Sequence, residues 1–119
     1  MIIEHDLLIY PRRIWVVKDE SFDHIKKDFS LREEDEKMTD EEIEENWDAF
    51  VISCQKNKYH GFMVFINGDC EDKTLVHEAL HVALNVYEEC SITLEAGMDQ
   101  EPLCYLVEYI YKLLKEDVK

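Results

Sequence analysis

Apolar residues occur in short blocks along the first two thirds of the chain, a pattern that predicts β-strands. Residues 1–10 and 14–17 form two such blocks, and we expect two short strands that flank a turn. Residues 47–55 and 61–67 form another pair on either side of a polar stretch, which is typical of a β-hairpin. Asn67-Gly68-Asp69 then ends the second strand, because these residue types favour turns.

Helical patterns occur early in the chain and again at its end. Ser21 can cap a short amphipathic helix over residues 22–29. Two longer helices are predicted over residues 73–89 and 100–116, the second with Asp99 as its N-cap and a proline in its first turn. Strands that come first and helices that come last indicate an α+β fold with a small antiparallel or mixed sheet.

The composition supports one folded domain over residues 1–119 and limits its partners. The chain is 46% hydrophobic, enough to bury a core, and its 119 residues are too few for two domains. Its 28 acidic residues against 13 basic ones give a net charge of −15, which repels nucleic-acid phosphates and anionic membranes. No apolar run reaches the roughly 18 residues that a membrane span needs. We therefore expect no nucleic-acid partner and no membrane association.

The N-terminus and the cysteines indicate the cytoplasm. Residues 1–6 lack the basic start and the long apolar core of a signal peptide. The cysteines form no Cys-x-x-Cys pair, so neither a zinc ribbon nor a thioredoxin-type site is predicted. They are Cys54, Cys70, Cys90 and Cys104. We expect reduced, mostly buried thiols, as is usual in a cytoplasmic protein.

Residues 33–48 contain ten acidic residues and a single lysine. Thr39 and Glu42 have the spacing of a capping box, so a helix is predicted to begin near Asp40. We interpret the stretch as a solvated helix and loop, and keep a surface for cations or for a basic partner as the alternative. The spacing of a calcium-binding loop is absent from it.

One five-residue motif carries chemistry, His77-Glu78-Ala79-Leu80-His81. On a helix, residues four apart lie on the same face one turn apart, so the two imidazoles can bind one zinc ion at about 2.0–2.1 Å. Glu78 follows the first histidine directly and can reach a zinc-bound water without binding the metal itself. Zinc lowers the pKa of such a water, and Glu78 would take its proton as general base.

The residues around this motif strengthen the metal hypothesis. Apolar side chains lie nearly all round residues 75–86, which predicts a buried central helix in which two histidines and a glutamate need partners. The alternative is a pair of ordinary half-buried histidines that hydrogen-bond to backbone carbonyls. A catalytic zinc also needs a third protein ligand. The downstream candidates are Cys90, Glu95, Asp99, Glu101, Cys104 and Glu108.

His77-Glu78-x-x-His81, followed 20 residues later by Glu101, resembles the gluzincin group of zincin metallopeptidases. The resemblance implies that His77, His81 and Glu101 are zinc ligands and that Glu78 is the general base. It also implies a minimal zincin-like fold, with an active-site helix, a packed C-terminal helix and a strand edge that pairs with extended substrate, here residues 61–67. The chain also resembles small zincin-like proteins of phage and bacterial genomes through its Glu-Pro-x-x-Tyr-Leu-Val segment.

The chain departs from the gluzincin pattern around the third ligand. Gln100 and Tyr105 occupy positions where thermolysin-like enzymes have Asn and Asp. No histidine follows the motif, so a tyrosine must stabilise the oxyanion, and Tyr105 is our candidate, with Tyr109 one turn further. Packing between helices is the simpler role for either tyrosine. His60 is a further candidate donor, and Asn85 a candidate support for a ligand.

These observations lead to two main hypotheses. The first is a zinc-dependent hydrolase of gluzincin type, a small metallopeptidase that uses a zinc-bound water activated by Glu78 on a peptide or protein substrate. The net charge of −15 favours a basic substrate. The second is a metal-stabilised or degenerate zincin fold that acts as a non-catalytic protein-binding module, which would not need Glu78. Two histidines and a carboxylate also suit iron(II), although such ligands normally lie on a β-barrel.

Overall fold

A five-stranded sheet forms the centre of the computed structural model, which describes residues 1–94 and 99–118. The strands are β1 (Ile2–Asp6), β2 (Arg13–Lys18), β3 (Ser30–Leu31), β4 (Ala49–Lys56) and β5 (Tyr59–Ile66). Their order across the sheet is β1-β2-β5-β4-β3. β2 and β5 run parallel and every other neighbouring pair is antiparallel, so the fold is α+β with a mixed sheet.

Both strand pairs expected from the sequence are present. β1 and β2 pair around a turn, and β4 and β5 form a hairpin with Lys56 opposite Tyr59. The expectation that residues 61–67 form an edge strand is wrong, because β5 lies between β2 and β4. Its burial gives the reason: every residue from Gly61 to Ile66 is buried, as in a strand that helices cover on both faces.

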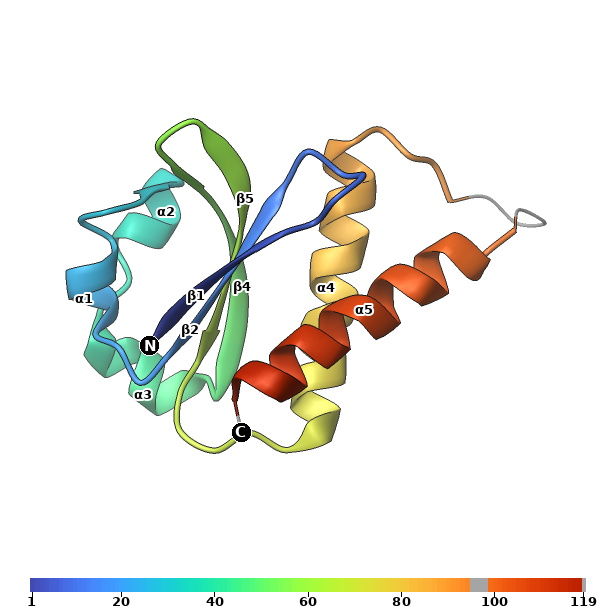
Figure 1. Cartoon of the computed structure of the whole chain (residues 1–119). Coiled ribbons are helices and arrows are strands. Elements are labelled where there is room, and N and C mark those ends of the chain that lie inside the picture. The colour runs from blue at the N-terminus through green and yellow to red at the C-terminus, as the bar shows by residue number, and fades with distance from the viewer. Residues whose placement is uncertain (95–98, 119) are drawn as a thin grey trace.

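Helices cover both faces of the sheet, so the core has two halves (Figure 1). Alternate residues of a strand point to opposite faces. In β2, Ile14 and Val16 pack in one half of the core, and Trp15 and Val17 pack in the other. The two C-terminal helices cover the first half, and short helices within residues 22–46 cover the second. The helices are α1 (Phe22–Ile25), α2 (Glu33–Glu36), α3 (Asp40–Asn46), α4 (Asp72–Glu89) and α5 (Glu101–Asp117).

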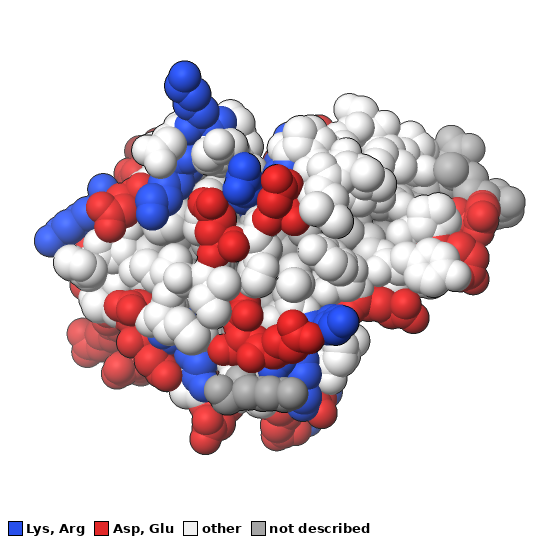
Figure 2. All heavy atoms as spheres, viewed as in Figure 1, with Lys and Arg blue, Asp and Glu red and all other residues white. Residues whose placement is uncertain are grey.

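Acidic side chains are spread unevenly over the surface. In the view of Figure 2, Asp and Glu side chains gather on the left half and along the lower border, whereas a broad uncharged area covers the upper right.

All four cysteines are free thiols, but only Cys54 is buried, whereas we expected most of them to be. None of the helices within the described residues is long and apolar enough to cross a membrane.

The short helices begin where their capping residues predict. The Thr39 side chain accepts a hydrogen bond in the first turn of α3, and the helix begins at Asp40 as expected. The Ser21 side chain does the same for α1. This helix is shorter than the one expected over residues 22–29, because it ends at Ile25 and the chain continues in turns.

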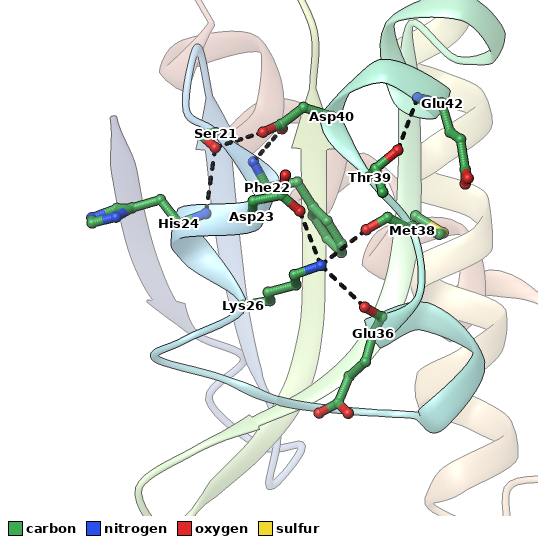
Figure 3. A network of polar contacts seen from close by, with 10 residues as sticks. All are labelled: Ser21, Phe22, Asp23, His24, Lys26, Glu36, Met38, Thr39, Asp40 and Glu42. Atoms are coloured by element: carbon green, nitrogen blue, oxygen red, sulfur yellow. Dashed lines mark hydrogen bonds and ion pairs between the residues drawn. The ribbon is translucent and has the colours of Figure 1, made fainter.

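Lys26 and Asp40 join the three short helices to one another (Figure 3). Lys26 Nζ donates to the carbonyl oxygens of Glu36 and Met38, each at 3.1 Å, and so holds the segment between α2 and α3 against α1. The Asp40 carboxylate accepts hydrogen bonds from the Ser21 hydroxyl and from the Phe22 backbone amide, each at 2.6 Å. These contacts fix the helical layer over its half of the sheet.

The two C-terminal helices match the predicted helices to within one residue at each end. Gln100 rather than Asp99 is the N-cap residue of α5, while the Asp99 carboxylate accepts from the Glu101 amide at 3.0 Å. The expectation that the motif helix is buried nearly all round is wrong, because the sheet and α5 cover only part of α4. Its exposed large apolar residues are Val76, Leu80 and Leu84.

Candidate metal centre

His77 and His81 lie one turn apart on α4 with their side chains directed toward each other. Their Nε2 atoms are 3.1 Å apart, and the two rings are nearly perpendicular with centroids 4.6 Å apart. Two nitrogens bound to one tetrahedral zinc ion at 2.0–2.1 Å are about 3.3 Å apart, so this donor pair fits zinc. Both histidines are exposed, contrary to the expectation of a buried pair, because this side of α4 faces a pocket at the start of β4.

Glu78 is the buried member of the motif. It is 5% exposed, and it is the one charged residue that is buried within the described part of the chain. Burial raises the pKa of its carboxyl, while positive charge on His77 and His81 opposes that increase. A raised pKa brings a carboxyl closer to neutral pH, where proton exchange with a reacting group is most efficient.

The three motif residues line a pocket of about 300 Å³ between α4 and β4. Apolar residues at the start of β4 form the opposite wall, and Asn85 extends the lining one turn along α4. The lining residues are Trp47, Ala49, Phe50, Val51, His77, Glu78, His81 and Asn85. This volume lies at the lower end of the range for small-molecule sites, about 300–1,000 Å³, and is enough for one or two substrate side chains.

The edge of β4 beside this pocket has no strand partner over residues 49–53 in the part of the chain that the structure describes. β3 pairs only with the far half of β4. The Asn67 amide donates to the Asp48 carbonyl oxygen at 2.8 Å. In an antiparallel pair every second residue bonds to the neighbouring strand, so this bond fixes which residues of β4 direct their peptide groups toward β5. Even-numbered residues of β4 bond to β5, so the peptide groups of Ala49 and Val51 face the open side. This is the geometry at which an extended peptide can add a strand.

Glu101 and Tyr105 do not lie with the motif residues. Both are in the first turns of α5, which crosses α4 obliquely and extends away from it at this end (Figure 1). Among the described residues, no three His, Cys, Asp or Glu side chains are close enough together to hold a metal ion. The structure therefore brings two nitrogen donors together at the motif and places Glu78 in the lining of the same pocket, without Glu101.

The other candidates from the sequence lie apart from this pocket, with one exception. Asn85 lines it, as a residue that supports a ligand should. Tyr105 and Tyr109 line an apolar groove beside the β1–β2 turn, and His60 lines a pocket at the other end of the sheet. Glu95 lies outside the described residues. The candidates that do not line the metal pocket also include Cys90, Asp99, Cys104 and Glu108.

The β4 wall of the pocket was not predicted from the sequence. Ala49 and Val51 alternate with Phe50, so the pattern alone shows that the first two share a face. It does not show that α4 covers this face, because the packing of helix on strand depends on contacts far apart in the chain. Trp47 gives a weaker signal, a large aromatic residue at the end of an acidic stretch.

No family model matches the chain, and neither a curated protein nor a solved structure matches it. The likeness to gluzincins therefore rests on the motif residues alone. What this site can bind follows from its own residues, which are two converging imidazole nitrogens, one buried glutamate and an adjoining strand edge.

Proposed function

We propose that the chain is a zinc-dependent hydrolase of the metallopeptidase kind, in which His77 and His81 hold the metal and Glu78 is the general base. The observation that carries this proposal is the convergence of the two Nε2 atoms, 3.1 Å apart, in a pocket that the buried residue Glu78 also lines. Two Nε2 atoms at this separation are placed to bind one metal ion, because two zinc-bound imidazole nitrogens lie at a similar distance from each other. We therefore interpret the two histidines as ligands of one metal ion.

The chain's own residues divide the work as follows. When bound, zinc supplies a Lewis acid that polarises a carbonyl group and lowers the pKa of a water molecule. The Glu78 carboxylate takes a proton from the attacking water and returns it to the leaving nitrogen as the C–N bond breaks. Its burial keeps competing water away and raises its pKa, which makes the return of the proton easier.

The substrate that suits this site is a basic peptide or protein segment in extended form. The open edge of β4 at Ala49 and Val51 adjoins the pocket and offers main-chain hydrogen bonds to such a segment. The net charge of −15 attracts Lys and Arg side chains and raises the rate of encounter. The four free thiols suit the reducing cytoplasm, where we place the protein.

A second candidate function follows from the position of Glu101. Without a third protein ligand among the described residues, the histidine pair falls short of the three protein ligands of a catalytic zinc site. The chain would then be a non-catalytic binding module that uses the same β4 edge. Glu78→Gln separates the two functions, because binding does not need a general base and hydrolysis does.

Zinc content is the first test. Wild type, His81→Ala and the control His60→Ala are purified without chelator or metal-affinity steps, and zinc per chain is measured by elemental mass spectrometry. About one zinc is expected in the wild type and in the control, and none in His81→Ala. A wild-type protein that takes up no zinc even when zinc is added would overturn the proposal.

The hydrolytic step has its own test. Wild type and Glu78→Gln, each shown to hold zinc, are incubated with a library of basic peptides, and new termini are detected by mass spectrometry. Cleavage by the wild type alone supports the hydrolase. Zinc binding without cleavage in either protein supports the binding module.

A further inference from the structure

An apolar groove lies between the β1–β2 turn and the first turns of α5. It has a volume of about 320 Å³, and none of its residues lines the metal pocket. Its lining residues are Leu7, Leu8, Ile9, Tyr10, Pro102, Tyr105, Leu106 and Tyr109. In Figure 2 the broad uncharged area lies over this turn and α5, with Asp and Glu side chains at its outer and lower border. An exposed groove with a mainly apolar lining is typical of an interaction site.

The turn holds two large aliphatic side chains in solvent. Leu8 is 74% exposed and Ile9 is 86% exposed. Backbone hydrogen bonds order this turn: the Tyr10 amide donates to the Leu7 carbonyl at 3.2 Å, and the Leu7 amide donates to the Arg12 carbonyl at 3.1 Å. Leu8 also has a φ of 59°, a left-handed conformation that favours glycine. The turn therefore holds a bulky apolar side chain exposed in a fixed position, where a partner can cover it.

The opposite wall is a ridge along α5. Pro102, Tyr105 and Tyr109 follow one another at intervals of three and four residues, which places them on one face of the helix. Tyr105 is 64% exposed although Leu106 next to it is buried. Ridges with this spacing are the ones that pack against another helix, so the groove suits a helix laid along α5.

Charge indicates which partner would bind. Glu101 and Glu108 lie about one turn to either side of Tyr105, and both are exposed, whereas Lys112 lies further along α5. A second copy of the chain would bring the same glutamates together and would set a net charge of −15 against another −15. A helix with Lys or Arg beside its apolar stripe instead gains favourable contacts at the border of the groove.

We propose that this groove docks a basic amphipathic helix of a partner protein. Apolar side chains of the helix fill the space between Ile9 and Tyr105, and its Lys or Arg side chains lie against Glu101 and Glu108. The groove is separate from the metal pocket, so this proposal does not depend on the hydrolase function.

The probe for the test is a synthetic 18-residue helical peptide of Leu and Lys, with Leu along one face, about 27 Å long as a helix. The control peptide has Glu in place of every Lys. Fluorescence anisotropy of the labelled peptides measures binding to wild type, Ile9→Thr and Leu8→Gly. Ile2→Thr is the matched control, because Ile2 is also exposed but lies on β1 away from the groove.

The Leu–Lys peptide is expected to bind the wild type and Ile2→Thr equally, and to bind Ile9→Thr and Leu8→Gly at least tenfold more weakly. Leu8→Gly should keep the wild-type Tm, because relief of backbone strain offsets the added freedom of the unfolded chain. Equal binding to all four proteins, or binding of the Leu–Glu peptide as tight as that of the Leu–Lys peptide, would overturn the proposal.

Two other occupants of the groove are tested in parallel. Sedimentation equilibrium that shows a wild-type dimer, lost in Ile9→Thr, would assign the groove to a second copy. Binding of the wild type but not Ile9→Thr to phosphatidylcholine vesicles would assign it to a lipid surface. Either result would overturn the proposal of a partner helix. A wild-type monomer that does not bind the vesicles supports it.

Discussion

Lys115, near the end of α5, pairs with Asp72, the first residue of α4. The pair joins the last turns of α5 to the first turn of α4, and from this contact α5 runs obliquely across α4 (Figure 1). The first turns of α5 therefore lie away from the first turn of α4, and they line the apolar groove beside the β1–β2 turn. This is why Glu101, which the gluzincin resemblance implies as a ligand, lies away from His77.

Glu101→Ala is predicted to retain zinc. Glu101 does not line the metal pocket, so its removal takes nothing from the histidine pair. Elemental mass spectrometry of Glu101→Ala beside His77→Ala measures this directly, with zinc expected in the first variant and lost in the second. Zinc loss in both would show that the start of α5 moves to the metal when it binds.

Gly61→Ala is predicted to destabilise the fold by about 3 kcal/mol or more. Gly61 pairs with Arg13 where β2 and β5 run parallel, and a Cβ at this position would lie 1.9 Å from the Arg13 carbonyl oxygen. Because that neighbour is backbone, only a shift of the strand could make room. Urea denaturation gives the free energy of unfolding.

Gly68→Ala is the matched control for this substitution. Gly68 has a φ of 69° but open space where a Cβ would be, so the change brings backbone strain without a clash. We expect it to cost about 1 kcal/mol. Equal losses in the two variants would mean that the close approach of β2 to β5 is not what requires Gly61.

Asp40 is predicted to make the free energy of unfolding decrease as the pH is lowered in the acid range. Burial pushes the pKa of its carboxyl upward, but hydrogen bonds from the Ser21 hydroxyl and the Phe22 amide outweigh burial, and the net pKa is lowered. Since the folded pKa lies below the ordinary value of 3.8, the contribution to stability is present above that value and is lost as pH falls through the folded pKa.

Unfolding by urea at a series of pH values from about 5 down to about 2 tests this dependence. Asp40→Asn should lower stability at pH 5 and lose less of it on acidification than the wild type does. Glu33→Gln, in an exposed part of α2, is the control that should follow the wild-type curve. Parallel curves for wild type and Asp40→Asn would contradict the assignment.

Cys54 is predicted to be unreactive in the folded protein. Burial, with the nearby negative charge of Glu89, raises the pKa of its thiol to about 12, so almost no thiolate forms at pH 8. Cys104 is exposed and should react quickly with a thiol reagent. In native protein, Cys104→Ser should remove a fast phase that Cys54→Ser leaves intact, and in denaturant the two variants should lose the same amount of reactive thiol. A slower native reaction in Cys54→Ser would show that the buried thiol is accessible.

The sequence by itself determined the local elements and the chemistry of the motif. Alternation of apolar residues located the strands, and the capping residue Thr39 located the start of α3, because these signals depend on neighbours a few residues apart. The i, i+4 spacing was sufficient to place His77 and His81 one turn apart. The sequence also shows a carboxyl group at Glu78, directly after the first histidine.

Tertiary structure decided what surrounds those elements. The parallel pairing of β2 with β5 moved residues 61–66 from the expected edge to the interior of the sheet, and left β4 beside the motif. The oblique packing of α5 on α4 separated Glu101 from His77 and exposed Tyr105 beside the β1–β2 turn. Both outcomes depend on contacts between residues distant in the chain, and the burial of apolar surface against the sheet selects among arrangements that the local pattern leaves equally open.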